Sequence, residues 1–156
     1  MALGGVLGNG SKIAYSSSSP VSWTRVAQLA NIDKFISLVA NLVDTTVYST
    51  SRIMTQMAGM IPAPTVEMTL EADLDPSTCA SQEALRSLQD SGATIWWRIE
   101  VPVNRAQSSF RAWEFRGFVQ NWSPELPIAD RQMIKVTIVF DGDGVAVYNP
   151  GASQIT

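Results

Sequence analysis

Apolar and polar positions alternate most regularly along the chain between residues 92 and 140. In the last part of this stretch, MIKVTIVF, the apolar side chains of Ile134, Val136, Ile138 and Phe140 fall on one side. The positions between them are mostly polar. A period of two over this length is typical of a half-buried β-strand, so the pattern predicts a strand over 133–140 with that apolar side facing the core.

The two segments before it carry large side chains on both faces. In IWWRIEV, Trp97 and Ile99 alternate with Arg98 and Glu100, and FRAWEFRGFVQNW likewise mixes aromatic and charged residues on both sides. Both segments predict strands, and Gly117 in the second predicts a bulge or a close approach of another backbone. Four of the five tryptophans lie here, namely Trp96, Trp97, Trp113 and Trp122. Two loaded faces exceed what one sandwich can bury and favour a strand shared with a second surface.

Weaker patterns fill the rest of the chain. Clean alternation predicts a strand over 65–71, and further strands are expected at 12–15, 21–29 and 39–48, with a loop at 31–35 and a turn at 141–144. One helix is predicted over about 76–90. Asp75 is a candidate N-cap, Pro76 suits the first helical position, and Gly92 suits a left-handed C-cap.

This order of elements predicts a mainly β fold, an antiparallel β-sandwich or barrel with one flanking α-helix. At 156 residues the chain is expected to form a single domain. The Gly-rich segment 1–11 reads either as a frayed terminus or as an arm that orders on a neighbouring subunit. Residues 46–61 read either as an interaction loop or as a helical turn over the core. Residues 149–156 are expected to be a flexible tail.

The composition argues against several classes of function. The net charge is −3, which argues against a nucleic-acid binder that must neutralise phosphates. The sequence contains no histidine, which excludes histidine-dependent catalysis, metal sites and pH switches. The single cysteine, Cys79, is expected to be buried as a small apolar residue. Neither a transmembrane run nor a signal peptide is apparent, so no membrane partner is expected.

The candidate catalytic, calcium-binding and phosphate-binding motifs are each incomplete. Glu67 and Glu71 share one face of a strand and are expected to be solvated rather than paired for catalysis. The DGDG run at 141–144 lacks the remainder of a calcium loop, and Gly-Ser-Lys at 10–12 does not match a phosphate-binding loop. We therefore expect no enzyme activity, and no catalytic, cofactor-binding or metal-binding residues.

The order of the segments resembles a major tail tube protein of long-tailed bacteriophages, within the superfamily that includes type VI secretion tubes. The resemblance rests on SSPVSWTRVAQL, LVDTTVYSTSRIMTQMAGM, PTVEMTLEADLDP, QEALRSLQDSGATIWWRIEVP and FRAWEFRGFVQNWSPELPIADRQMIKVTIVFDG, which together span residues 17–142. The segment IDKFISLVAN departs from the pattern because it is more apolar than the polar connection expected there.

The resemblance implies a structural subunit that forms six-membered rings, stacked into a tube with a continuous inner β-barrel that conducts the viral genome into the host. Implied partners are further copies of the chain, tail tip or baseplate and tail terminator proteins, a tape measure protein in the lumen, and double-stranded DNA in transient passage. The implied location is the virion tail, after assembly from the host cytoplasm. An acidic chain suits a lumen through which DNA slides, because it repels phosphates.

Two sets of residues follow as candidates. Charges on the two-sided strands suggest Arg98, Glu100, Glu114 and Arg116 as lumen or inter-subunit residues. The inter-subunit loop suggests Thr46, Arg52, Met54, Met57 and Met60, whose flexible methionines suit an adaptable contact. Two other functions stay open: a type VI secretion-like tube, and a carbohydrate-binding β-sandwich that uses the tryptophans as a platform.

Overall fold

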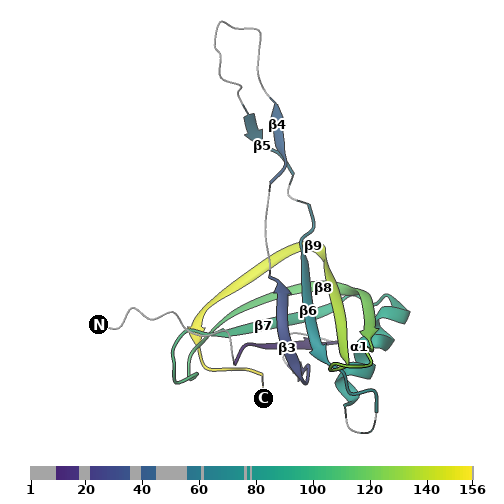
Figure 1. Cartoon of the computed structure of the whole chain (residues 1–156). Helices are drawn as coiled ribbons and strands as arrows, with labels where there is room; N and C mark the ends of the chain where they lie inside the picture. The colour runs from purple at the N-terminus through teal and green to yellow at the C-terminus, as the bar shows by residue number, and fades with distance from the viewer. Residues whose placement is uncertain are drawn as a thin grey trace, which may run out of the picture.

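The computed structural model describes residues 10–17, 22–35, 40–44, 56–60, 62–75, 77 and 79–155. It confirms a mainly β fold with one helix among these residues (Figure 1). The strands are β1 (Lys12–Ser16), β2 (Thr24–Arg25), β3 (Leu29–Lys34), β4 (Leu42–Asp44), β5 (Gln56–Ala58), β6 (Thr65–Glu71), β7 (Ile95–Pro102), β8 (Phe110–Glu125) and β9 (Met133–Gly151), and the helix is α1 (Ala80–Ser91).

All strands except β4 and β5 form one seven-stranded antiparallel sheet in the order β2-β1-β7-β8-β9-β6-β3. The long strands β8 and β9 take part in two layers of this sheet. The first half of β8 pairs with β7, and its second half pairs with the first half of β9, which in turn pairs with β6. The layer of β2, β1 and β7 thereby faces the layer of β6 and β3 across a common core (Figure 1).

The passage from one layer to the other lies at Gly117 and Asp141–Gly144. Here the pairing of β8 with β9 steps from Gly117↔Phe140 to Phe115↔Val145, so that four residues of β9 oppose one residue of β8. Gly142 takes a positive φ of 99°. A Cβ atom on Gly117 would lie 2.5 Å from the carbonyl oxygen of Val139, so the predicted close approach at this glycine is confirmed. The DGDG run is a bulge inside one long strand, and the expected turn and strand end there are wrong.

The alternating patterns build the core as expected. Ile134, Val136, Ile138 and Phe140 are buried, as are the apolar positions of β6, which has the predicted bounds Thr65–Glu71. They meet Ile13, Trp97 and Ile99 from the opposite layer in a single cluster, joined by Leu85 of the helix. Burial of each such side chain contributes about 1.5–3 kcal/mol.

The helix packs mainly against β8 and is fastened at its start by Gln82. This buried side chain accepts a hydrogen bond from the Asp73 amide (2.9 Å) and donates one to the Glu71 carbonyl (2.7 Å). The predicted C-cap is confirmed, because Gly92 is left-handed and its amide caps the carbonyls of Leu88 and Gln89. The predicted start is wrong, because α1 begins at Ala80 and Cys79 precedes it. Cys79 is buried, as expected.

The Asp75 side chain explains the late start of the helix. Its carboxylate accepts hydrogen bonds from the amide (3.0 Å) and hydroxyl (2.7 Å) of Ser77, which closes a local turn in place of a cap. This pairing with Ser77 lowers the pKa of Asp75. An aspartate that forms an Asx-type turn therefore marked the turn before the helix and not the helix itself.

Between residues 21 and 48 the prediction was least accurate. The expected strand over 21–29 is reduced to β2 (Thr24–Arg25), and the expected loop at 31–35 is largely β3. Edge position explains the error: β3 pairs only with β6 and through two register shifts, so its side chains need not alternate. Of the strand predicted over 39–48, β4 contains residues 42–44, and residues 45–48 lie outside the described part of the chain.

Substitution Gly117→Ala is expected to destabilise the chain by about 1–3 kcal/mol, because the added methyl group must displace the backbone at Val139. The matched control is Gly151→Ala, since a Cβ there meets nothing nearer than 3.9 Å. The free energy of unfolding in urea measures both changes. Equal stability of the two variants would show that the bend does not depend on this contact.

Candidate assembly surfaces

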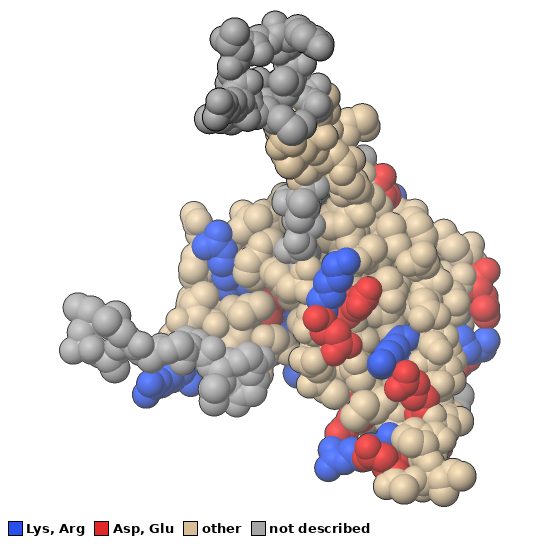
Figure 2. All heavy atoms as spheres, turned by 45° about the horizontal axis from the view of Figure 1, so that its top comes forward, with Lys and Arg blue, Asp and Glu red and all other residues tan. Residues whose placement is uncertain are grey.

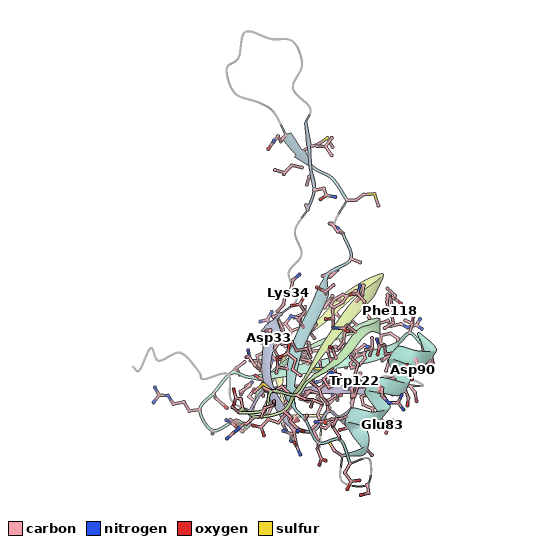
Figure 3. The ribbon with its side chains drawn as sticks, turned by 45° about the vertical axis from the view of Figure 1, so that its right-hand side comes forward. Asp33, Lys34, Glu83, Asp90, Phe118 and Trp122 are labelled. Carbon is pink, nitrogen blue, oxygen red and sulfur yellow. The ribbon has the colours of Figure 1, made fainter. Side chains whose placement is uncertain are left out.

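Two strand edges of the layer formed by β8, β9, β6 and β3 have no partner among the described strands. β3 pairs on one side only, with β6. β8 from Phe118 onward pairs only with β9, because β7 begins at Ile95, opposite Gly117, and does not extend past it. Asp33 and Lys34 on β3 lie on one side of the body, and Phe118 and Trp122 on β8 lie on the other (Figure 3). Unpaired strand edges are templates for pairing with another chain.

The directions of these strands matter for such pairing. Each neighbouring pair in the series β8, β9, β6, β3 is antiparallel. The two edge strands β8 and β3 therefore run in opposite directions. When copies are placed side by side in the same orientation, β3 of one copy meets β8 of the next as an antiparallel pair, and the ladder continues without a break.

The outward face of this layer is polar and carries charges of both signs. Its residues alternate with the buried positions of β6 and β9, and cross-strand partners lie side by side on it. The charged members are Asp33, Lys34, Glu67, Glu71, Glu125, Arg131 and Lys135. Lys135 pairs with Glu125 at 3.3 Å, and Arg131 pairs with Glu71. Acidic and basic side chains lie next to each other on the face turned to the viewer in Figure 2, without a basic stripe.

The hairpin of β4 and β5 projects away from the body (Figure 1). Its described apolar side chains are largely exposed: Leu42 at 67%, Met57 at 56% and Met60 at 86%. Gly59 is held close to the Asn41 backbone, and its amide donates to the Asn41 carbonyl at 2.6 Å. The hairpin is thus a paired ribbon that presents apolar side chains to the surroundings rather than to its own core.

A buried ionic cluster lies on the outer face of the opposite layer, beneath residues 153–155. Arg98, Glu100 and Glu114 are 4%, 0% and 6% exposed. Arg98 Nη1 donates to Glu114 Oε1 at 2.5 Å, and its Nε lies 3.6 Å from Glu100 Oε1. Tyr148 donates to the other Glu114 oxygen at 2.8 Å. One cation thus lies between two carboxylates and offsets part of their charge within the buried site.

The segment after β9 closes this cluster. Glu100 accepts hydrogen bonds from the amides of Gln154 (3.0 Å) and Ile155 (3.0 Å) and from the Ser153 hydroxyl (3.1 Å). Lys12 reaches across from β1 to the Ile155 carbonyl at 3.3 Å. Where a flexible tail was expected, residues 149–151 belong to β9 and Ile155 is 2% exposed.

The predicted site residues are therefore distributed over several environments. Arg98, Glu100 and Glu114 come together, but inside the single chain and covered by its own backbone. Arg116 is partly exposed, lies 5.5 Å from the Trp96 ring and faces Asp141 at 3.9 Å. Met57 and Met60 are exposed on the hairpin, whereas Thr46, Arg52 and Met54 lie outside the described residues.

Sequence reasoning missed the open edges and the strand β3 that forms one of them. The sequence did show that Glu67 and Glu71 alternate with buried residues on β6. This alternation identifies the polar face of the strand, but it does not show which strands pair with β6 or which edges stay open. Two of the four tryptophans suggested as a platform are packed within the chain. Trp97 is fully buried in the core and donates to the Gly117 carbonyl at 3.1 Å, and Trp113 packs edge-on against Phe35.

The described residues offer neither a metal site nor a membrane-spanning helix. They contain no group of three or more His, Cys, Asp or Glu side chains arranged to hold a metal ion. Among them there is also no helix with the length and apolar character needed to cross a membrane.

Comparisons with known proteins identify the fold. No protein-family model matches the sequence, and no curated protein matches it. Several solved structures are similar to this chain. A chain from the tail of an empty gene transfer agent particle, refined with C6 symmetry, has a TM-score of 0.67 at 11% identity and covers 88% of this chain and 95% of its own.

Two other solved structures are similar over almost the whole chain. A chain of the anti-feeding prophage baseplate has a TM-score of 0.72 at 10% identity, over 96% of this chain and 98% of that one. The SPP1 tail tube has a TM-score of 0.65 at 13% identity, over 97% and 81%. The resemblance to tail tube proteins drawn from the sequence is confirmed as a shared fold.

Substitution Glu100→Gln is expected to cost about 1.5–3 kcal/mol of folding free energy, because a neutral amide accepts the hydrogen bonds of Ser153, Gln154 and Ile155 more weakly than the buried carboxylate does. Glu67→Gln is the matched control, since Glu67 lies exposed on the polar face of β6 and should change stability by less than about 0.5 kcal/mol. Urea unfolding of both variants checks this. A cost at Glu100 no larger than that at Glu67 would contradict the role assigned to the cluster.

A pH effect is expected from Tyr148. Its hydrogen bond to Glu114, with burial and the Glu114 charge, raises the pKa of this tyrosine in the folded state. The neutral phenol is therefore favoured on folding. Its contribution is complete below the ordinary tyrosine pKa of about 10 and is lost as the pH rises through the higher folded value. The stability difference between the wild-type chain and Tyr148→Phe should thus be larger at about pH 9 than at about pH 11. A difference independent of pH would refute the assignment.

Proposed function

We propose that this chain is a structural subunit of a phage-type tail tube, built from six-membered rings that stack along one axis. The observation that carries the proposal is the layer of β8, β9, β6 and β3 with two open edges that match as antiparallel neighbours. Head-to-tail pairing of these edges in a ring leaves no free edge, because the sheet closes on itself. The C6 symmetry of the similar gene transfer agent tail supports six copies.

In such a ring the polar face of the β8–β9–β6–β3 layer lines the lumen. This face is exposed in the single chain and carries mixed charges with no basic stripe, so DNA phosphates find no row of cations to bind. The buried set Arg98, Glu100 and Glu114 reaches a lumen or a neighbour only after residues 153–155 are displaced. Arg116 is accessible without such a change and is the remaining lumen or inter-subunit candidate of that set.

The hairpin and its surroundings serve the contacts between subunits. The segment 46–61 is the inter-subunit loop, and the exposed Met57 and Met60 belong to it. The first 11 residues are a second arm, whose positions 1–9 lie outside the described residues. The whole chain functions as one tube domain without a catalytic role.

The remaining partners follow from a tube with this purpose. They are a tape measure protein in the lumen, double-stranded DNA in transit, terminator proteins at one end, and tail tip or baseplate proteins at the other. The place of action is the virion tail, reached from the host cytoplasm. The likeness to an anti-feeding prophage baseplate chain favours one alternative, a tube of an injection system that carries other cargo.

The test is negative-stain electron microscopy of the purified chain over a range of high concentrations. Six-fold rings and hollow tubes are expected, because open β-edges and the apolar hairpin pair at sufficient concentration. Analytical ultracentrifugation of the same samples measures the mass of the smallest ring. A chain that stays monomeric throughout, with a native spectrum, would argue against a tube subunit.

A further inference from the structure

Exposed apolar side chains gather at the end of the sheet opposite the hairpin. Leu74, Leu126 and Ile128 are 49%, 54% and 106% exposed, and we call them the end patch. They lie on two connections at the same end of the sheet, because Glu71, Met133 and Glu125 are neighbours in register there. Large apolar side chains that are exposed next to one another, as a contiguous patch, often mark a site of interaction with another protein.

The connections that carry the end patch are fastened to each other. The Ala72 amide donates to the Gln132 carbonyl at 2.9 Å, and Arg131 pairs with Glu71 across the same gap. Pro127 restricts the backbone directly before Ile128. A surface held in this way loses little conformational entropy when a partner binds.

The hairpin of β4 and β5 enters and leaves the body at the other end of the same strands. It joins β3 to β6 at Thr65, whereas the end patch follows Glu71, six residues further along β6. This separates the two by about 20 Å along the strand. The hairpin also points away from the body (Figure 1), so within one chain neither apolar surface covers the other.

We propose that the end patch is the docking surface for the β4–β5 hairpin of a second copy of this chain, in the adjacent ring. The inference rests on the proposed tube and names the receiving surface for its arm. The two surfaces are different and lie at opposite ends, so their contact is heterologous and repeats along an open polymer. Both carry exposed apolar side chains, and residues 41–43 and 56–60 of the hairpin bear no charge, whereas Asp44 at the end of β4 is acidic.

The chemistry of the two surfaces is complementary. Met57 and Met60 have flexible side chains that adapt to a fixed partner, and the fastened end patch provides one. Ile128 is fully exposed, so docking removes its whole side chain from water. Loss of that contact should raise the protein concentration needed for tubes by roughly tenfold to a hundredfold.

Disulfide trapping tests the contact directly, in a background in which the buried Cys79 is replaced by alanine. Two separate chains, one with Met60→Cys and one with Ile128→Cys, are mixed, assembled and oxidised. Covalent dimers that contain one chain of each kind are expected, and only under conditions that give tubes. The matched control replaces Ile128→Cys by Val103→Cys, an exposed apolar residue in the β7–β8 connection, which should give no such dimer.

A second variant separates stacking from ring formation. Ile128→Asp should retain the fold and the six-membered rings but lose tubes, whereas Val103→Asp should form tubes as the unmodified chain does. Deletion of residues 52–59 should reproduce the loss from the hairpin side. Tubes of Ile128→Asp at the normal concentration, or trapping at Val103 instead of Ile128, would overturn the inference. Failure of the unmodified chain to form any ring or tube counts against the proposed function itself.

Discussion

The close backbone approach between Gly117 and the Val139 carbonyl is the constraint on which the rest of the fold depends. At this point β8 leaves one layer and enters the other, and β9 follows by means of the bulge at 141–144. A side chain at position 117 would keep the strands apart at the bend. The short distance thus allows two strands to serve both layers and to enclose one core.

The sharing of β8 and β9 between two layers also determines which strand edges stay unpaired on the outside of the subunit. Because β7 begins opposite Gly117, the second half of β8 has no strand on that side among the described residues, and β3 leaves another unpaired edge across the layer. A monomeric protein commonly protects such edges, whereas here they lie beside a polar sheet face and an apolar hairpin. The surface is consistent with a subunit whose edges are completed by copies of itself.

Sequence reasoning predicted the parts of the fold that local rules determine. The strands over 65–71 and 133–140 alternate because one face is buried, and Gly92 ends α1 because a left-handed cap favours glycine. The sequence also indicated the role of Gly117, because glycine weakens the interior of a strand and often marks a bulge or a close approach of another backbone. These features depend on neighbours that lie close in sequence or on a single buried face.

Features set by distant partners could not be predicted in this way. β3 has an irregular edge pairing, so NIDKF shows no alternation, and Asp75 forms a turn with Ser77 that resembles a cap in sequence. DGDG reads as a turn because only the pairing partner Phe115 shows that the strand continues. The sequence suggests Arg98, Glu100 and Glu114 together with Arg116, which lies apart from them beside Asp141, and the cover of the buried three comes from residues 153–155, which no sequence signal links to Glu100.

That cover is separate from the hydrophobic core. Every buried member of the core cluster precedes residue 141, and the last side chain packed against it is Val145. Glu100, in contrast, obtains its backbone donors from residues 54 and 55 positions later. The core therefore does not depend on the segment that covers the ionic cluster. Residues 153–155 could be removed or displaced without taking a side chain from the core cluster, and the charged face would then be open to water.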